Sequence, residues 1–477
     1  MGRIIEINPG TRAEGEIKIT IILDEKGNAK DAYFQILTFG GFEAFMIGRP
    51  AEEAPRIATR ICGVCPWAHH LCAAKAVDSL FGRAPTETAV KLRRLGYYAH
   101  MIDSHTIHFF ILALPDFYPG LGENERNILG ILRKNPELVK RLLKIRAYVR
   151  EIEEIIGGKA THPVTAIPGG VSKRLTEDER RKIESYSKEI LQFTMETWEF
   201  FRGIVEKTKF IEDTTYYLET YYVGLVGEDD ALEFYDGPAK ILAPDGEEVA
   251  KFMPEQYLDY IAEHVETWTY PKFPYLRIKG WKGFVDGKDS GIYRVGPLAR
   301  INVAKKITTE KAEEAYRDML SFFGKKPIHN SLAYHWSRVI EMIYSAEMIN
   351  ELITNPEITR DDTVNLEGNY RGKGIGFIEA PRGFLIHHYE ADEKAIITKA
   401  NHIVPTTMNN PAICLDVKRA ARKLIRERKI NKDLLRRVEM AFRCYDPCIT
   451  CSVHSVGYPI VIEIFDSDGK LIAKLRR

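Results

Sequence analysis

The sequence predicts an α+β protein that is mostly helical, with a large central helical bundle, an N-terminal β-hairpin region and an inserted β lobe. Three observations carry the prediction. Helical periodicity runs through most of the chain, strand patterns occupy its first 40 residues, and helix signals thin out between residues 215 and 303, where Gly, Pro, Tyr and Asp accumulate. At 477 residues the chain exceeds the size that one core usually serves, so we expect either one large unit with sub-lobes or two domains.

The first 40 residues carry strand signals. Segments 4–7, 15–23 and 31–38 are rich in Ile and other strand formers, and the last two are separated by a turn at Lys26-Gly27-Asn28. These residues predict the β-hairpin region, 1–40. Glu14 lies at a loop-to-strand junction, where a carboxylate either caps a turn or takes part in chemistry.

A helix buried on most sides is predicted for residues 86–114, because apolar side chains occur on nearly every face of that stretch. Such a helix belongs at the centre of a bundle. Further helices are predicted at residues 124–156, 309–323 and 331–353, at 416–428 with an extension towards 442, and after a capping box formed by Thr176 and Glu179.

The remaining segments predict strands and loops. Residues 215–303 predict the β-rich insert, around one small helix near residues 255–264. Residues 375–404 predict a further strand-and-loop region. Residues 459–465 and 470–475, separated by Asp466-Ser467-Asp468-Gly469, predict a β-hairpin at the end of the chain.

Composition and charge argue against several classes of protein. The 68 Lys and Arg residues nearly balance 67 Asp and Glu residues, and a net charge of +1 does not suggest a nucleic-acid or membrane-surface partner. The longest strongly apolar run, residues 107–114, is too short to span a bilayer, and the N-terminus has no apolar signal core. We therefore expect a soluble chain. The share of Lys, Arg, Glu and Ile is a weak indication of a thermophile.

Two C-x-x-C pairs are the strongest chemical signal, with Cys62 and Cys65 near the start of the chain and Cys448 and Cys451 near its end. Seven cysteines, four of them paired in this way, fit metal or redox chemistry in a reducing compartment better than a disulfide scaffold. Almost the whole chain separates the pairs, which is far more than a zinc finger or ribbon needs. We therefore expect four sulfur ligands at one buried transition-metal centre.

Eight short motifs, two of which contain the C-x-x-C pairs, are spread along almost the whole chain. They are Arg12-Ala13-Glu14-Gly15, Gly41-Phe42-Glu43, Arg60-Ile61-Cys62-Gly63-Val64-Cys65 followed by His69, His162-Pro163 with Gly169-Gly170, the segment from Tyr293 to Arg300, Ala380-Pro381-Arg382-Gly383, Val404-Pro405-Thr406-Thr407, and Asp446-Pro447-Cys448 through Cys451 and His454. In this order they resemble the large, catalytic subunit of nickel-iron hydrogenases. The resemblance implies the nickel-dependent hydrogenase large-subunit fold and the reversible heterolytic cleavage of dihydrogen to protons and electrons.

The resemblance implies which cysteines bind which metal. All four thiolates of Cys62, Cys65, Cys448 and Cys451 would bind nickel, and Cys65 and Cys451 would also bridge to an iron that carries cyanide and carbon monoxide. Thiolates suit a soft, redox-active nickel and can bridge two metals. Cys62 and Cys448 would then be the terminal ligands.

The resemblance also implies a proton path and a second metal site. Cys448 would be the first proton acceptor and Glu14 the next station, because a partly buried carboxylate can relay protons. Glu43 and His454 match ligands of a remote magnesium or iron ion that braces the C-terminal end.

Around the metals, the resemblance implies a pocket of four further residues. Arg382 would lie over the open metal face and bind a cyanide nitrogen, with Asp446 as its ion-pair partner. Pro381 would wall the pocket, and the Thr406 hydroxyl would donate to the other cyanide. Where many uptake members have an aspartate beside the pocket, this chain has Ser104, so one acidic contact to Arg382 is missing or replaced.

The number of cysteines indicates that a partner protein carries the electrons. Once four cysteines are assigned, the three that remain cannot form the usual four-cysteine iron-sulfur site. The resemblance therefore implies a hetero-oligomer with an iron-sulfur small subunit, and the chain looks most like the cytoplasmic hydrogenases of archaea and some bacteria. These pass electrons through a further subunit of the flavin, deazaflavin coenzyme, NAD(P) or heterodisulfide reductase type.

The last 23 residues follow the histidine at which mature chains of this family end. Family precursors carry such a tail, which a dedicated maturation protease removes after nickel insertion. We therefore expect residues 1–454 to form a single large catalytic unit and residues 455–477 to be a C-terminal extension that is cleaved off.

Two alternatives from other classes stay open. A structural four-cysteine zinc protein would contain one zinc, no nickel and no infrared bands of metal-bound cyanide and carbon monoxide. A non-catalytic subunit like those of respiratory complex I shares the fold but lacks the metal, and retention of all four cysteines argues against it.

Overall fold

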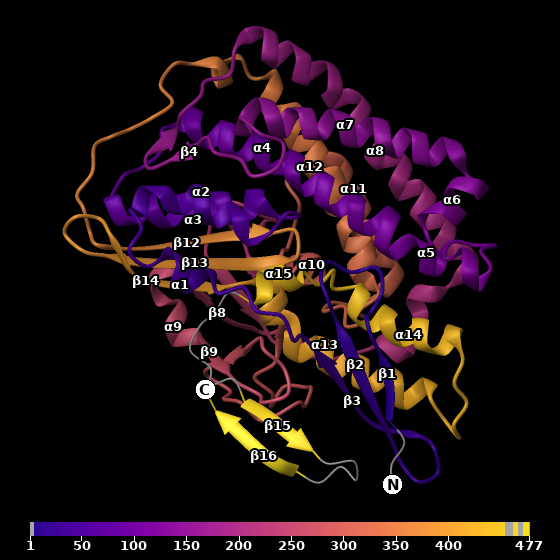
Figure 1. Cartoon of the computed structure of the whole chain (residues 1–477). Coiled ribbons are helices and arrows are strands. Elements are labelled where there is room, and N and C mark those ends of the chain that lie inside the picture. Colours follow the sequence, from indigo (N-terminus) through magenta and orange to yellow (C-terminus); the bar gives the residue numbers. More distant parts are fainter. Residues whose placement is uncertain (1–3, 454–460, 466–470, 477) are drawn as a thin grey trace.

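The computed structural model of the chain describes residues 4–453, 461–465 and 471–476. Figure 1 shows the long helices α4, α7 and α8 on one side of a three-stranded sheet, β12–β13–β14, and strands together with helices α13 and α14 on the other. The helices are α1 (Phe42–Met46), α2 (Ala54–Ala58), α3 (Pro66–Phe81), α4 (Glu87–Thr106), α5 (Leu114–Phe117), α6 (Ile128–Lys134), α7 (Pro136–Gly157), α8 (Glu177–Thr208), α9 (Tyr257–Tyr260), α10 (Pro297–Val303), α11 (Glu310–Phe323), α12 (Ala333–Thr354), α13 (Pro405–Leu424), α14 (Lys432–Arg443) and α15 (Ile449–Ser452). The strands are β1 (Ile4–Ile7), β2 (Lys18–Leu23), β3 (Ala29–Gln35), β4 (Ala166–Ile167), β5 (Gly170–Val171), β6 (Tyr221–Leu225), β7 (Ala239–Leu242), β8 (Glu248–Phe252), β9 (Ile261–His264), β10 (Phe273–Leu276), β11 (Tyr293–Arg294), β12 (Lys373–Ala380), β13 (Gly383–Ala391), β14 (Ile397–Ile403), β15 (Val461–Phe465) and β16 (Leu471–Arg476). The predicted α+β class, with far more helix than strand, is confirmed.

The central helix is α4, which packs against α7 and α12. It continues without a break into a π-helical segment, residues 107–113, and then into α5, so the prediction for residues 86–114 is confirmed. The predicted helix at 124–156 is instead two helices, α6 and α7. The break occurs because the Asn135 side chain accepts a hydrogen bond from the Leu138 N–H at the start of α7, and Pro136 follows as its first residue.

The capping box forms as predicted at the start of α8. The Thr176 hydroxyl accepts from the Glu179 N–H at 3.3 Å, and the Glu179 carboxylate accepts from the Thr176 N–H at 3.0 Å. Both bonds satisfy backbone donors that the first turn of a helix leaves unpaired. They anchor a helix that runs to Thr208 along the side of the bundle.

The inserted lobe contains a four-stranded sheet of order β11–β6–β7–β8 and a β9–β10 hairpin. Two local predictions there were wrong. The expected helix at 255–264 ends after α9, and Ile261–His264 form strand β9, because their backbone pairs with β10. Residues 297–303 form helix α10, which starts with Pro297 directly after Gly296, a residue with a φ of 97°.

The helix predicted from residue 416 begins eleven residues earlier, as α13 at Pro405, and it contains Pro411. Proline at the first helical position costs nothing because no hydrogen-bond partner exists for its missing N–H. The chain leaves the helix after Leu424, and the expected extension is a separate helix, α14, capped by Asn431.

The sheet β12–β13–β14 is the wall between the helical body and the β lobe. On one face it packs against α3, which approaches so closely that a Cβ on Gly376 would lie 2.2 Å from the Cys72 carbonyl oxygen. The other face joins the core of the β lobe, which includes Phe377, Phe384 and Ile386. Both faces are therefore buried, which explains why β12 and β13 are nearly continuous runs of buried residues.

β12 and β13 form a hairpin whose two-residue tip is Pro381-Arg382, because Ala380 pairs with Gly383. The tip is held by Arg300 of α10, whose guanidinium donates to the carbonyl oxygens of Ala380 at 2.9 Å and Pro381 at 3.2 Å. Two buried acidic side chains, Glu341 and Glu379, contact Arg300 at 2.6 Å each, and burial raises the pKa of Glu379 to about 7. Burying the Arg300 guanidinium without such partners would cost several kcal/mol of folding free energy. Arg300 therefore stabilises the tip only when its acidic partners are present.

The two ends of the chain meet in space. The N-terminal strands form an antiparallel sheet, β1–β2–β3, as predicted, and Glu14 makes an isolated parallel bridge to Cys448. The two strands predicted at the C-terminus are β15 and β16, which pair antiparallel, whereas their turn lies outside the described residues.

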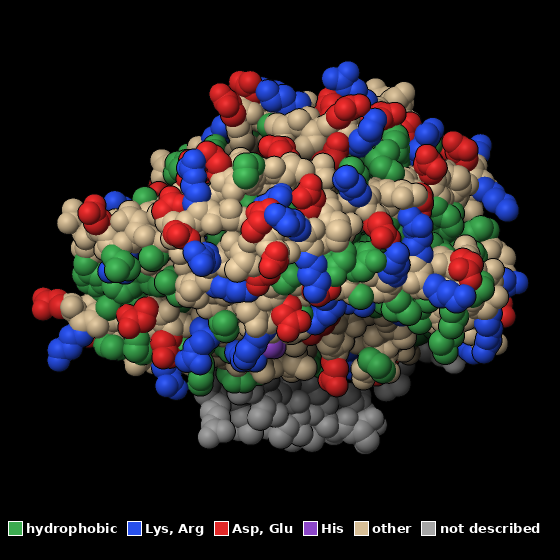
Figure 2. Space-filling view, turned by 90° about the horizontal axis from the view of Figure 1, so that it is seen from above, with side chains coloured by type: hydrophobic (Ala, Val, Ile, Leu, Met, Phe, Trp, Pro, Cys, Tyr) green, Lys and Arg blue, Asp and Glu red, His purple; other side chains and the backbone are tan. Residues whose placement is uncertain are grey.

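The surface carries both signs of charge. Figure 2 shows Lys and Arg interspersed with Asp and Glu over the helical face that is seen from above. In the described part of the chain, no helix combines the length and the apolar character that crossing a membrane requires.

We predict that Gly376→Ala destabilises the protein by about 1–3 kcal/mol, because the added methyl group would meet backbone atoms of α3 that cannot move separately. Thermal unfolding followed by circular dichroism measures the change.

The matched control is Gly203→Ala on exposed α8, where an added Cβ meets no atom within 4 Å. This change should leave stability unaltered or raise it by up to about 1 kcal/mol. Equal losses in both variants would show that α3 does not depend on its close approach to β12.

Candidate metal centre

The structure brings together the four cysteines of the two C-x-x-C pairs. Cys62 and Cys65 precede α3, Cys448 and Cys451 belong to the first turn of α15, and every side chain is at most 3% exposed. Their four sulfur atoms all lie within 4.8 Å of one another. The sulfur of Cys62 lies 3.2 Å from that of Cys448, and Cys65 and Cys451 are the same distance apart.

The electrostatics of this cluster favour one negative charge and oppose four. Hydrogen bonds from the neighbouring thiols lower the pKa of Cys62 well below its usual value, and the charge of Arg382 acts in the same direction. Burial raises the pKa of Cys448 and of Cys451 well above the usual value. A bound cation is what would allow all four sulfur atoms to be thiolates.

The residues present fit a soft transition metal. Four buried sulfur donors match thiolate-preferring metals, and no other group of three or more His, Cys, Asp or Glu ligands forms among the described residues. Beside the sulfurs, Arg382 Nη1 is a buried donor without a hydrogen-bond partner in the described structure. A buried N–H of this kind is expected to face an acceptor, such as a ligand carried by a metal.

Arg382 projects from the β12–β13 tip and is bound to Asp446. Its Nε donates to the Asp446 carbonyl oxygen at 2.7 Å, and its Nη2 lies 3.1 Å from a carboxylate oxygen of the same residue. Burial tends to lower the pKa of Arg382, but the negative charges of Asp446 and the cysteines outweigh it and raise the pKa well above its usual value. Arg382 is therefore a permanent cation beside the sulfur cluster.

Two other pocket residues lie where they can act on the cluster. The Thr406 hydroxyl oxygen accepts from the Cys448 N–H at 2.9 Å, which leaves the hydroxyl proton available for an acceptor in the site. Pro381 is buried next to Arg382 in the hairpin tip. Ser104 is buried and its hydroxyl has no partner among the described residues, so no acidic side chain replaces the missing aspartate at that position.

Glu14 reaches the cluster through a residue that the sequence did not reveal. Its carboxylate accepts from the Thr450 hydroxyl at 2.8 Å and from the Thr450 N–H at 3.1 Å. The same hydroxyl lies 3.7 Å from the Cys448 sulfur. Thr450 thus links Cys448 to the half-buried carboxylate of Glu14. The one feature of the sequence that could have indicated this role is the position of Thr450 inside the second C-x-x-C pair.

The predicted second metal site is only partly within the described structure. Glu43 is buried in α1, and its carboxylate accepts from the backbone N–H of His402 at 2.8 Å. His454 lies outside the described residues.

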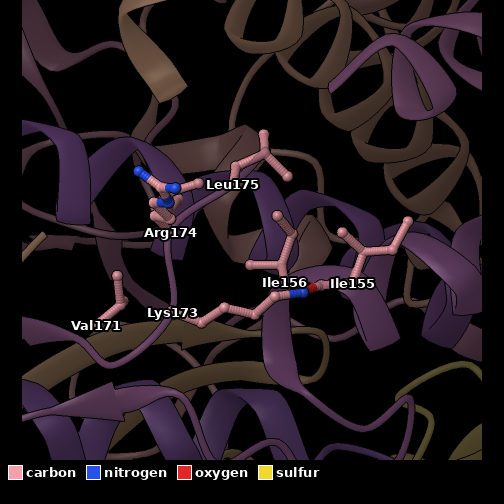
Figure 3. Close-up of a pocket in the computed structure, with 7 residues that line it drawn as sticks. Ile155, Ile156, Val171, Lys173, Arg174 and Leu175 are labelled. Carbon is pink, nitrogen blue, oxygen red and sulfur yellow. The ribbon is translucent and has the colours of Figure 1, made fainter. Parts of the chain in front are cut away.

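The other cysteines and one small crevice lie apart from this chemistry. Cys72, Cys414 and Cys444 are buried singly, and burial raises the pKa of each, as expected for apolar core residues. The crevice in Figure 3 has about 10 Å³ of space, room for one water, and is lined by α7 residues and the segment 171–175 without any cysteine or histidine.

Comparisons with known proteins agree with this arrangement. Residues 40–119 and 285–454 match the nickel-dependent hydrogenase family, and residues 4–39 match the HoxL-like family. The chain is 44% identical to a subunit of an F420-non-reducing hydrogenase from Archaeoglobus profundus, over 99% of both chains. It is 35% identical to the NAD-reducing hydrogenase HoxS subunit beta of Cupriavidus necator, over 100% of both chains.

Solved structures extend the likeness to three dimensions. The crystal structure of an NAD⁺-reducing [NiFe]-hydrogenase in the H₂-reduced state superimposes with a TM-score of 0.89 at 36% identity, covering 95% of this chain and 99% of that chain. Together with the family match, this shows that the chain belongs to the nickel-dependent hydrogenase family and is the large, catalytic subunit of a nickel-iron hydrogenase.

Proposed function

We propose that Cys62, Cys65, Cys448 and Cys451 bind one nickel ion, and that Cys65 and Cys451 also bridge it to an iron ion with cyanide and carbon monoxide ligands. The observation that carries this proposal is the cluster of four buried sulfurs. The sulfur separations, 3.2 Å for both Cys65–Cys451 and Cys62–Cys448, do not distinguish the two pairs, so the bridging role of Cys65 and Cys451 rests on the resemblance to nickel-iron hydrogenases. When bound, the metal pair supplies the site at which dihydrogen binds and through which its two electrons leave.

The proton leaves along side chains of this chain. Cys448 Sγ takes the proton, which passes to Thr450 Oγ1 while the Thr450 hydroxyl gives its own proton to the Glu14 carboxylate. The support is the geometry, with 3.7 Å for the first gap and 2.8 Å for the second. Thr450 is exposed and Glu14 half-buried, so this path ends at the edge of the chain. A relay of this kind is general acid–base catalysis by positioned groups.

Arg382, Asp446, Thr406 and Pro381 shape the ligand side of the centre. Arg382 offers its unpartnered Nη1 donor and Thr406 its hydroxyl proton to the two cyanide nitrogens. Asp446 orients Arg382 through two hydrogen bonds, and Pro381 covers the pocket as part of the rigid hairpin tip.

Glu43 and His454 are proposed to hold a magnesium or iron ion that braces the C-terminal end of the mature chain. The support is the buried carboxylate of Glu43, which suits a hard cation. Residues 1–454 form the catalytic unit in this proposal, and a maturation protease removes residues 455–477 once nickel is in place.

Electrons pass first to an iron-sulfur small subunit, then to a further electron-transfer subunit, in a cytoplasmic hetero-oligomer. Relatives named as subunits of larger hydrogenases support the existence of partners. A relative described as F420-non-reducing at 44% identity favours NAD(P) or a heterodisulfide reductase over deazaflavin as the acceptor.

Metal analysis and infrared spectroscopy of the purified complex test the proposed centre. We predict one nickel per chain and absorption bands of metal-bound cyanide and carbon monoxide. One zinc per chain, without nickel and without such bands, would establish the structural zinc alternative instead. A complex with neither metal nor bands would indicate a non-catalytic subunit.

We predict that Glu14→Gln lowers the rate of hydrogen oxidation by about 10²-fold or more, because an amide cannot accept the relayed proton. Nickel content and infrared bands should be those of the wild type.

The control is Glu16→Gln, a carboxylate two residues away that is exposed. It should oxidise hydrogen at the wild-type rate. If Glu14→Gln also keeps that rate, the proton leaves by a different route.

We predict that the nickel-loaded chain ends at His454. Intact-mass spectrometry of active protein should show loss of residues 455–477, and nickel-free protein should retain them. A full-length mass in active, nickel-loaded protein would refute the cleavage.

A further inference from the structure

A continuous row of buried hydrogen bonds leads away from the sulfur cluster, separate from the route to Glu14. Nε2 of His69 lies 3.4 Å from the Cys451 sulfur, and Nδ1 of the same ring lies 3.0 Å from Nε2 of His387. Nδ1 of His387 lies 2.8 Å from the Tyr389 hydroxyl, which lies 3.0 Å from Nε2 of His402. All four of these side chains are buried.

The fold builds this row of hydrogen bonds from two packed elements, helix α3 and the sheet β12–β13–β14. His387 and Tyr389 are two residues apart on β13, so both point to the face that packs on α3. His402 is the cross-strand partner of His387 on β14. His69 comes from α3, which the glycines of β12 allow to approach the sheet closely. None of the four is near another in sequence except His387 and Tyr389.

The Cys451 sulfur at one end of the row determines which atom donates in each of its hydrogen bonds. A metal-bound thiolate carries no proton, so Cys451 can only accept, and the proton of His69 must be on Nε2. Nδ1 of neutral His69 then accepts from His387 Nε2, and Nδ1 of His387 accepts from the Tyr389 hydroxyl. The Tyr389 oxygen in turn accepts from His402 Nε2. The reverse arrangement of all bonds would place a lone pair of His69 against the sulfur.

We infer that Tyr389, His387 and His402 are positioning residues, which orient and polarise the His69 ring so that it keeps one hydrogen bond on the Cys451 sulfur. Each bond in such a row polarises the next, and hydrogen bonds to a ligand sulfur reduce the electron density that it donates to its metal. The inference rests on the proposed centre, in which Cys451 bridges nickel and iron. It assigns this row of side chains to electronic tuning of the centre.

Tyr389→Phe tests the inference in the complete hydrogenase complex. The variant removes the donor to His387 and the acceptor for His402 while keeping the ring, so His387 is held less firmly as a donor to His69 and the hydrogen bond from His69 to the Cys451 sulfur weakens. We expect the carbon monoxide infrared band to shift to lower wavenumber, because a more electron-rich iron donates more into that ligand. Nickel content should be unchanged.

Two further variants separate tuning from stability. His402→Gln keeps an N–H donor for the Tyr389 oxygen, so its carbon monoxide band should stay at the wild-type position. Tyr257→Phe is the matched control, because the Tyr257 hydroxyl lies 2.9 Å from Nδ1 of His388 on the opposite face of β13. It removes the same kind of buried tyrosine–histidine bond and should not shift the band.

The outcomes distinguish this inference from the proposed function. A wild-type complex without infrared bands would overturn the proposed centre and this inference with it. A normal wild-type spectrum with an unshifted band in Tyr389→Phe, or with an equal shift in Tyr257→Phe, would overturn the inference alone.

Discussion

Four buried thiol groups that share one small volume are the constraint on which the rest of the structure depends. Their sulfur atoms lie within 4.8 Å of one another, and burial opposes their ionisation, so the cluster needs positive charge to become four thiolates. Arg382 supplies one permanent cation at its edge, and a bound metal would supply the rest. Because the cysteines come from both ends of the chain, the same cluster also joins the two ends: Glu14 of the N-terminal segment pairs with the backbone of Cys448.

The sheet β12–β13–β14 is the scaffold that aims side chains at the cluster from two directions. Its two-residue tip presents Arg382, and the Arg300 network holds that tip by its carbonyl oxygens. Its inner face presents His387 and Tyr389 to α3. A buried sheet is suited to this task, because its central strand β13 is hydrogen-bonded on both sides and its side chains cannot change face without a register shift. The β lobe covers the other face of the sheet and so supports the scaffold that positions these side chains.

Two polar routes meet the cluster and differ in character. The route through Thr450 to Glu14 leads outward to an exposed hydroxyl and a half-buried carboxylate, which suits proton transfer. The row from His69 to His402 is buried along its whole length, which suits a fixed hydrogen bond. The centre can thus lose protons by the first route, while the second keeps its electronic environment constant.

The sequence by itself determined the fold class, most long helices, the strands at 4–38 and 375–404, and the four cysteines, because periodicity and spacing are local properties of the chain. It did not predict the break at Pro136, the strand at 261–264 or the start of α13 at Pro405, where capping, strand pairing and burial override local preference. Nor did it find Thr450 or the row of His387, Tyr389 and His402. Thr450 is marked only by its place inside the second C-x-x-C pair, and the residues of the row carry no spacing signal, since each acquires its partner only when α3, β13, β14 and the two chain ends pack together. Only the tertiary structure decided which side chains face the sulfur atoms, because direction and distance between remote segments exist only after folding.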